Sequence, residues 1–366
     1  MKPRERVLRA FRRLEGLPDR VPIQFDLCTQ LLEHFAQKLD LPLHYTRNLF
    51  EDVTYRISGN EIRTALGSDV VLTGASEISE SVQRLDDGTW YNEYGMRMGQ
   101  GEIYVEILTF PLAEVQTVSD VNAYTFPDPL IATRYADAGR IVNQFKDSYL
   151  VIADIEVTIF SLAQELVGME KLLIDMASGA EYVQPLFQAC ADFQTQVGLK
   201  LIECGVDALW AGDDFGSQNG LLISPQMFRQ SLKPHYACMN QAFKSANPDI
   251  LLLLHSDGAV SPVLEDVVEL GYEVFNPLQP GVPGHGPEDL KNGFGNSLCF
   301  WGGIDQQQLL PHGSDAELET TIREYIEILG AGGGYMISPA HIIQADVIPE
   351  RVETFVALCK RYGRYE

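Results

Sequence analysis

Three side chains in the C-terminal half of the sequence have the types and the spacing of a metal site. His255 and Asp257 stand two residues apart in the segment LLLLHSDG, so on an extended chain both side chains project to the same side. His341 ends a later apolar segment, YMISPAH. Two imidazoles and a carboxylate bind Zn²⁺ or a similar divalent ion and leave one coordination position for a substrate. The sequence therefore predicts a metal site, although a buried histidine followed by a helix cap also fits the His-x-Asp pattern.

Acidic residues at the ends of two other apolar segments are candidates for acid–base catalysis. Glu156 ends LVIADIE, and Asp213 and Asp214 end ALWAGDD. Adjacent carboxylates raise each other's pKa, but adjacent residues of a strand point to opposite sides. We therefore expect one of the two aspartates, taken as Asp214, to act together with Glu156. The other is expected to cap a helix or to pair with a base such as Arg229.

Further polar residues at the ends of apolar segments are expected to orient a substrate through carboxylate and amide groups. They are Asp26, Asn276, Gln279, Asp305 and Gln344. For Asn276 and Gln279, satisfaction of the backbone at an Asn-Pro turn is the alternative. His285 lies in a loop rich in glycine and proline and is expected to face solvent.

The segments that carry these residues are short, apolar and nearly continuous, which is typical of parallel strands buried on both faces. There are eight of them: VPIQFD (21–26), DVVLTG (69–74), LVIADIE (150–156), ALWAGDD (208–214), ILLLLHSDG (250–258), VFNPLQP (274–280), LCFWGGID (298–305) and YMISPAH (335–341). Helical periodicity fills the stretches between them. This order predicts an α/β fold, a single (β/α)8 TIM barrel whose carboxyl strand ends form one mouth. A doubly wound sheet normally has a glycine-rich first turn, which VPIQFDLCTQ lacks.

One domain is predicted over residues 1–366, since no linker or repeat divides the chain. An N-terminal amphipathic helix is expected to pack on the barrel through four apolar residues at helical spacing: Val7, Leu8, Phe11 and Leu14. Residues 75–149 form a stretch that is too long for a single crossover helix. We expect them to form an insertion between the second and third strands, with extended segments at 102–116 lying over the barrel mouth.

The composition argues against several classes of partner. The net charge is −24 and the pI is about 4.6, so the surface repels nucleic acids and anionic membranes. The apolar runs fall short of the roughly 20 residues that span a bilayer, and no secretory signal is recognised. Six cysteines without a CxxC pair indicate no disulfide framework. We expect a cytoplasmic protein, and the sequence leaves both a monomer and a homo-oligomer open.

Several motifs taken together resemble those of the uroporphyrinogen decarboxylase superfamily. They are DDFGSQNGLLISPQMFRQSLKPHY (213–236), LHSDGAV (254–260), VFNPLQPG (274–281), WGGIDQQQLLPHG (301–313) and GGYMISPAHIIQADVIPE (333–350). The resemblance implies the same barrel. True decarboxylases of the superfamily carry an arginine-rich segment near the first strand, which grips the substrate carboxylates. The matching stretch here, RVPIQFDLCTQLLEHF, has no arginine after Arg20.

The resemblance therefore points to the cobalamin-dependent methyltransferases of the superfamily. Members that act on thiols bind zinc through His-x-Cys-Gly and a later cysteine in Pro-Gly-Cys-Gly. This chain has His255-Ser256-Asp257-Gly258 and Pro339-Ala340-His341-Ile342 at the matching places. His255 carries over directly, whereas Asp257 and His341 replace cysteines and form a harder ligand set, better suited to an oxygen or nitrogen ligand.

The activity implied is removal of a methyl group from a small methoxylated or methylamine-type substrate. The metal or an acid activates the leaving group, and the methyl group passes to Co(I) of cobalamin. The chain has no DxHxxG cobalamin motif, so the cobalamin is expected on a separate corrinoid protein. Two alternatives remain. One is a cofactor-free lyase that decarboxylates a small substrate held by Asp26, Asp214 or Asp305. The other is a non-catalytic small-molecule binder.

Overall fold

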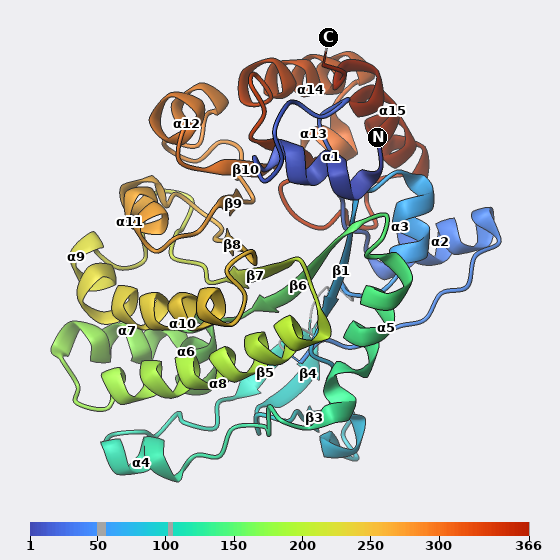
Figure 1. Ribbon diagram of the computed structural model, residues 1–366. Coiled ribbons are helices and arrows are strands. Elements are labelled where there is room, and N and C mark those ends of the chain that lie inside the picture. The colour runs from blue at the N-terminus through green and yellow to red at the C-terminus, as the bar shows by residue number, and fades with distance from the viewer. Residues whose placement is uncertain (50–55, 102–104, 366) are drawn as a thin grey trace.

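The centre of the protein is a curled sheet of seven parallel strands (Figure 1). The computed structural model describes residues 1–49, 56–101 and 105–365. The strands, in their order across the sheet, are β1 (Val70–Gly74), β6 (Leu150–Glu156), β7 (Ala208–Gly212), β8 (Leu251–His255), β9 (Val274–Asn276), β10 (Cys299–Ile304) and β11 (Tyr335–Pro339). Because every neighbour pairs in parallel, all carboxyl ends meet at one edge of the sheet. The predicted parallel α/β architecture is confirmed.

Every residue of these strands is buried, as the continuous apolar runs predicted. Alternate residues of the strands, among them Leu72, Ile152 and Leu253, form one apolar cluster on one face of the sheet. Helix α1 (Pro3–Ala10) adds Val7 and the following Phe11 to this cluster. The predicted N-terminal helix is therefore present and packs on the sheet. It ends before Leu14, whose side chain is exposed.

The first predicted strand, residues 21–26, is not assigned as a strand, although it lies where that strand was expected. Isolated parallel bridges join Ile23 to Ile337 and Leu27 to Ile343. On its other side, the backbone N–H of Asp69 donates to the carbonyl of Ile23 over 2.8 Å. The segment thus lies between β11 and the start of β1, the two edges of the sheet. The described chain has seven assigned strands in this sheet, not the predicted eight.

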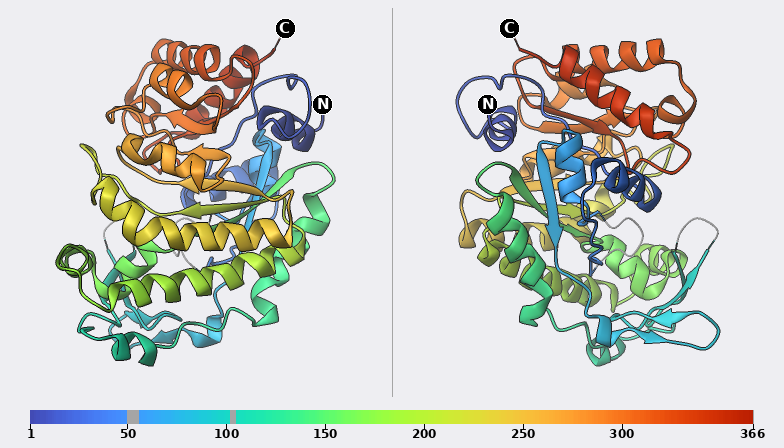
Figure 2. Two further views of the ribbon diagram at one scale, coloured as in Figure 1. Left: turned by 60° about the vertical axis from the view of Figure 1, so that its left-hand side comes forward. Right: turned by 90° about the vertical axis from the view of Figure 1, so that its right-hand side faces the viewer.

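Helices follow the strands and cover the outside of the sheet (Figure 2). The longer ones are α2 (Thr29–Leu39), α5 (Ala136–Phe145), α7 (Met169–Ser178), α8 (Val183–Cys204), α10 (Lys233–Ala246), α14 (Asp315–Leu329) and α15 (Pro349–Tyr362). Shorter helices are α3 (Asn60–Leu66), α4 (Val118–Ala123), α6 (Phe160–Val167), α9 (Pro225–Met227), α11 (Leu264–Glu269), α12 (Pro287–Phe294) and α13 (Leu309–His312). Among the described helices, none is long and apolar enough to cross a membrane.

A second, antiparallel sheet lies between β1 and β6 in the chain. Its strands are β2 (Gln83–Arg84), β3 (Trp90–Tyr91), β4 (Arg97–Gln100) and β5 (Val105–Thr109). Extended segments were predicted at residues 102–116. Residues 102–104 of this range lie outside the described residues. Helix α5 packs on β1 and β6 and so belongs to the parallel fold. The range 75–149 therefore contains a crossover helix as well as extended strands.

Candidate active site

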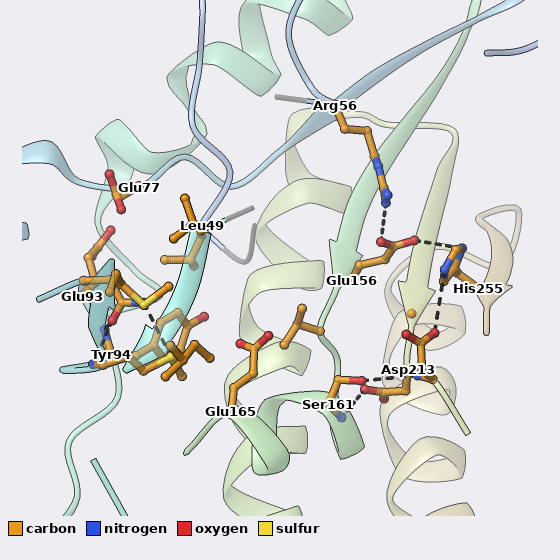
Figure 3. Close-up of a pocket in the computed structure, with 18 of the residues that line it drawn as sticks. Leu49, Arg56, Glu77, Glu93, Tyr94, Glu156, Ser161, Glu165, Asp213 and His255 are labelled. Atoms are coloured by element: carbon orange, nitrogen blue, oxygen red, sulfur yellow. Dashed lines mark hydrogen bonds and ion pairs between the residues drawn. The ribbon is translucent and has the colours of Figure 1, made fainter. Parts of the chain in front are cut away.

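A cavity of about 310 Å³ lies between the carboxyl ends of the parallel strands and the antiparallel sheet. Figure 3 shows Glu156, Asp213 and His255 on one side and Leu49, Glu93 and Tyr94 on the other. A volume of this size suits a small molecule. The position of the cavity is the one where parallel α/β proteins bind ligands, because polar loop residues converge there on a rigid sheet.

His255 is the last residue of β8, and its ring orientation is fixed by Asn276 at the end of β9. The Nδ1 atom of His255 lies 2.6 Å from Asn276 Oδ1. The amide nitrogen of Asn276 donates to the carbonyl of Trp301 over 3.0 Å, so its oxygen is left to accept from Nδ1–H. The Nε2 atom of His255 consequently points toward Asp214 and Asp257.

Three potential ligand atoms meet at this point. His255 Nε2 is 3.9 Å from Asp214 Oδ1 and 3.8 Å from Asp257 Oδ1, and the potential ligand atoms of the three residues lie within 4.8 Å of one another. His341 lines the same cavity, with its ring centroid 6.5 Å from that of His255. The structure thus brings the predicted trio to one cavity and adds Asp214 next to His255. Their role as metal ligands stays a prediction.

The two adjacent aspartates after β7 have different surroundings. Asp213 is buried and caps helix α6, accepting from the backbone N–H of Ile159 over 2.8 Å and of Ser161 over 2.6 Å. It also accepts from the hydroxyl of Tyr236. Burial raises the pKa of Asp213 to about 6. Asp214 instead faces the cavity and accepts from the backbone N–H of Asp257 over 2.9 Å.

The structure therefore decides between the two roles proposed for the second aspartate. Asp213 caps a helix, as one alternative held. The other alternative, a pair with Arg229, is wrong, because the Arg229 guanidinium lies 2.9 Å from Asp266. That pairing places Arg229 on the outer helices rather than at the strand ends.

Glu156 is held by a residue that the sequence analysis did not identify. Arg56 donates to Glu156 Oε2 and stacks its guanidinium on Trp210, 4.5 Å from the ring centroid. Glu156 Oε1 lies 3.3 Å from His255 Nδ1. Gly212, opposite Glu156 on β7, leaves the room that its side chain needs, since a Cβ there would clash with it. Arg56 lies 100 residues from Glu156 in sequence, and no spacing pattern marks it.

The carboxylates around His255 change its protonation. Burial lowers the pKa of His255, but Glu156, Asp257 and Asp214 outweigh burial and raise this pKa to about 9. The pKa of Asp214 is raised because the surrounding protein removes water and because Asp257 is close. Burial also opposes ionisation of Glu156, yet Arg56 and His255 keep its pKa below the ordinary value. The cluster stabilises positive charge at His255.

The five predicted substrate-binding residues are distributed over several places. Asp26 is buried and accepts from Arg63 and, over 3.0 Å, from the Gln24 amide. Asn276 orients His255 and is itself buried. Gln279 and Asp305 line a second cavity of about 510 Å³, which shares Asp257 and His341 with the first. Gln344 lines neither of these two cavities.

The expectation that His285 faces solvent is wrong. Its side chain is buried on the ring of Phe275, and its Nε2 atom accepts from the backbone N–H of Val260 over 3.3 Å. Burial lowers the pKa of His285 to about 4, so this histidine is neutral. The loop rich in glycine and proline therefore folds back on the protein body.

The fold and the position of the cavity place this chain among parallel α/β proteins that bind small molecules at the carboxyl ends of their strands. The family model for uroporphyrinogen decarboxylase (URO-D) matches residues 95–362. The chain therefore belongs to the uroporphyrinogen decarboxylase family. No curated protein matched the sequence.

Solved structures support the fold. A methyltransferase from Methanosarcina mazei superposes with a TM-score of 0.72 at 16% identity, covering 99% of both chains. Looser matches include xylanase 10B from Thermotoga maritima, with a TM-score of 0.40 at 9% identity over 64% of this chain and 82% of that one. A β-L-arabinopyranosidase from Geobacillus stearothermophilus gives 0.41 at 9% identity, over 95% and 76%. The Methanosarcina protein shares the whole fold, and the two glycosidases carry no further argument.

Proposed function

We propose that the protein is a corrinoid-dependent methyltransferase, which removes a methyl group from a small methoxylated or methylamine-type substrate and passes it to a separate corrinoid protein. The observation that carries this proposal is the group formed by His255 Nε2, Asp214 and Asp257 in the cavity at the strand ends. The methyltransferase description of the Methanosarcina protein with the same fold supports it.

The residues present fit a divalent metal such as zinc. The Nε2 atom of His255 faces two carboxylates, and Asn276 accepts from its other nitrogen, which is the arrangement that orients a metal-binding histidine. His341 is a further candidate ligand from the facing loop. A metal bound here would supply Lewis-acid activation of a leaving oxygen or nitrogen.

The chain's own side chains would position and protonate the substrate. Asp214 is accessible from the cavity, and its raised pKa suits a group that holds a proton for a leaving oxygen. Glu156 stays ionised beside Arg56 and stabilises positive charge at His255. The antiparallel sheet forms the wall of the cavity opposite the strand ends.

The same site disfavours decarboxylation of a polycarboxylate. The two arginines near the strand ends already bind carboxylates of the protein, since Arg56 pairs with Glu156 and Arg63 with Asp26. Most charged residues that line the described part of the cavity are acidic. A substrate with several carboxylates would be repelled there.

Two measurements on purified protein test the proposal: metal content, and methyl transfer from methoxylated and methylamine compounds to free cob(I)alamin. We expect a bound divalent metal and His255-dependent transfer. His255→Ala should reduce transfer by about 10²–10³-fold, the usual effect of removing one electrostatic stabiliser. His312→Ala is the matched control, because His312 is exposed and remote from the cavity. Release of CO₂ from a carboxylated substrate without corrinoid, with no methyl transfer, would contradict the proposal.

A further inference from the structure

The wall of the cavity opposite His255 carries apolar, aromatic and thioether side chains beside the carboxylates of Glu77 and Glu93. It is formed by the antiparallel sheet and its turns, which contribute Tyr94, Met96, Met98 and Ile107 (Figure 3 labels Tyr94). Aromatic rings and thioethers are polarisable surfaces that pack well against methyl groups. This wall alone would accept many small apolar ligands.

Tyr94 adds an aromatic ring and a buried hydroxyl to this wall. Tyr94 is only 4% exposed, and its Oη atom has no hydrogen-bond partner among the described residues. Its ring is held edge-on against Phe193 at 5.9 Å. Tyr94 therefore offers a ligand in the cavity a fixed aromatic ring.

The charged residues around the cavity determine which sign of charge a ligand there should carry. Seven carboxylates line the described part of the cavity: Glu77, Glu93, Glu156, Glu165, Asp213, Asp214 and Asp257. The one arginine among these lining residues is Arg56. Two arginines behind the wall compensate further, with Arg47 lying 3.7 Å from Glu77 and Arg134 2.7 Å from Glu93. Carboxylates remain in excess even if one divalent cation binds beside His255.

A compact ligand that is both cationic and covered with methyl groups satisfies both walls. Its charge is attracted by the carboxylates and by the face of Tyr94. Its methyl groups contact Met96 and Met98. A neutral methoxylated compound gains nothing from the excess of acids, and an anionic one is repelled.

We propose that the cavity binds a methylated ammonium ion, which makes an amine-type compound the methyl donor. The role of this ligand as methyl donor rests on the proposed methyltransferase function. The ligand class itself is argued from the cavity alone. In the transfer, the C–N bond breaks and its electron pair stays on nitrogen, so a neutral amine leaves without needing a proton. The methyl group bonds to Co(I) of the partner's corrinoid, whose electron pair forms the new bond.

Calorimetric binding to the purified chain tests the ligand class without any corrinoid. The probes are choline and its neutral isostere 3,3-dimethylbutan-1-ol, which replaces the ammonium nitrogen by carbon and keeps the shape. At constant ionic strength we expect choline to bind at least about 10-fold more tightly, the value of one charge-dependent contact of about 1.4 kcal/mol. Equal binding of the two probes, or binding of neither, would overturn the inference.

Glu165→Gln provides the matched variant. Glu165 lies on α6 between the two walls in Figure 3, and the substitution removes its charge with little change of shape. Choline affinity should fall about 3- to 10-fold and that of the neutral alcohol should not change. Glu170→Gln, an exposed acid on the next helix, should change neither affinity. A fall in choline affinity of the same size in both variants would contradict a local site.

The two proposals fail in different ways. Selective choline binding without methyl transfer from any amine would remove the transferase function and leave the ligand class standing. Transfer from methoxylated donors together with equal binding of the two probes would leave the function and remove the ammonium class.

Discussion

Two groups of charged side chains lie at opposite ends of the central sheet, and they differ in charge balance. At the amino end, Asp69 precedes β1 and accepts from Arg6 over 2.6 Å, from Arg20 over 2.8 Å and from the backbone N–H of Ile23 over 2.8 Å. At the carboxyl end, His255 faces three carboxylates, of which Glu156 also binds Arg56. The first group is neutralised by cations, whereas the second keeps an excess of acid.

The difference separates structural from functional ionic groups. Asp69 joins the N-terminal helix, the first extended segment and β1, and it lines neither cavity at the strand ends. The group around His255 lines a cavity and shifts the pKa of its members in opposite directions. A balanced buried network holds elements together, and an unbalanced one next to a cavity attracts a cation.

The largest expected effect is on the balanced group. Asp69→Ala leaves two arginines, Arg6 and Arg20, without their shared buried partner. We expect the free energy of unfolding to fall by about 3–5 kcal/mol, measured by urea denaturation. A loss below about 1 kcal/mol would mean that Asp69 is not the structural centre that its contacts indicate.

The unbalanced group should instead make stability depend on pH. The pKa of His255 is raised from 6.5 to about 9 in the folded protein, so the folded state binds this proton more tightly than the unfolded chain. The resulting stabilisation is complete below about pH 6.5 and is lost as the pH rises toward 9. Without divalent metal, we expect a loss of about 2–3 kcal/mol across this window.

The comparison variant for this pH dependence is His255→Gln, which removes the titrating ring. Denaturation curves recorded from pH 6 to pH 9.5 should then show a markedly flatter dependence. If the free energy of unfolding depends on pH equally in both proteins, a group other than His255 causes the dependence.

A smaller effect is expected at Asn276, which orients His255 without reaching the cavity. Asn276→Ala removes the acceptor for His255 Nδ1 and should weaken metal affinity by about 10–100-fold, measured by competition with a chelator. Asn276→Asp keeps an acceptor oxygen and should retain most of the affinity. Unchanged metal affinity in the alanine variant would show that Asn276 does not support the metal site.

The smallest effect on stability is expected at Asp214. Asp214→Asn removes one of several like charges near Asp257, and its side chain is 53% exposed. The free energy of unfolding should change by less than about 1 kcal/mol, in the stabilising direction. Methyl transfer should nevertheless fall, because the site loses one of the carboxylates that stand beside His255. A strongly destabilised variant would show that this group is structural, like the one around Asp69.

Much of this arrangement follows from local sequence patterns. The apolar runs identified the strands of the parallel sheet, since burial on both faces demands continuous hydrophobicity. The position of His255 and Asp257 at the end of a run was enough to place both at the carboxyl edge. The first run, 21–26, has the same composition but forms only isolated bridges, and composition alone does not reveal that difference.

The polar residues at the run ends were less predictable, because each has several possible partners. Asp213 and Asp214 are neighbours in sequence, and only the packing of α6 turned one into a cap and left the other in the cavity. His285 was expected to be exposed because its loop is rich in glycine and proline, yet the loop folds onto Phe275.

The sequence by itself determined the class of fold, the edge at which chemistry is possible and the acidic character of the protein, because these depend on residue type and short-range periodicity. Only the tertiary structure decided which charges meet. Arg56 reaches Glu156 across 100 residues, and Tyr94, in the turn between β3 and β4, comes to line the same cavity as His255. Such contacts depend on how distant segments pack in space, and no local spacing encodes them.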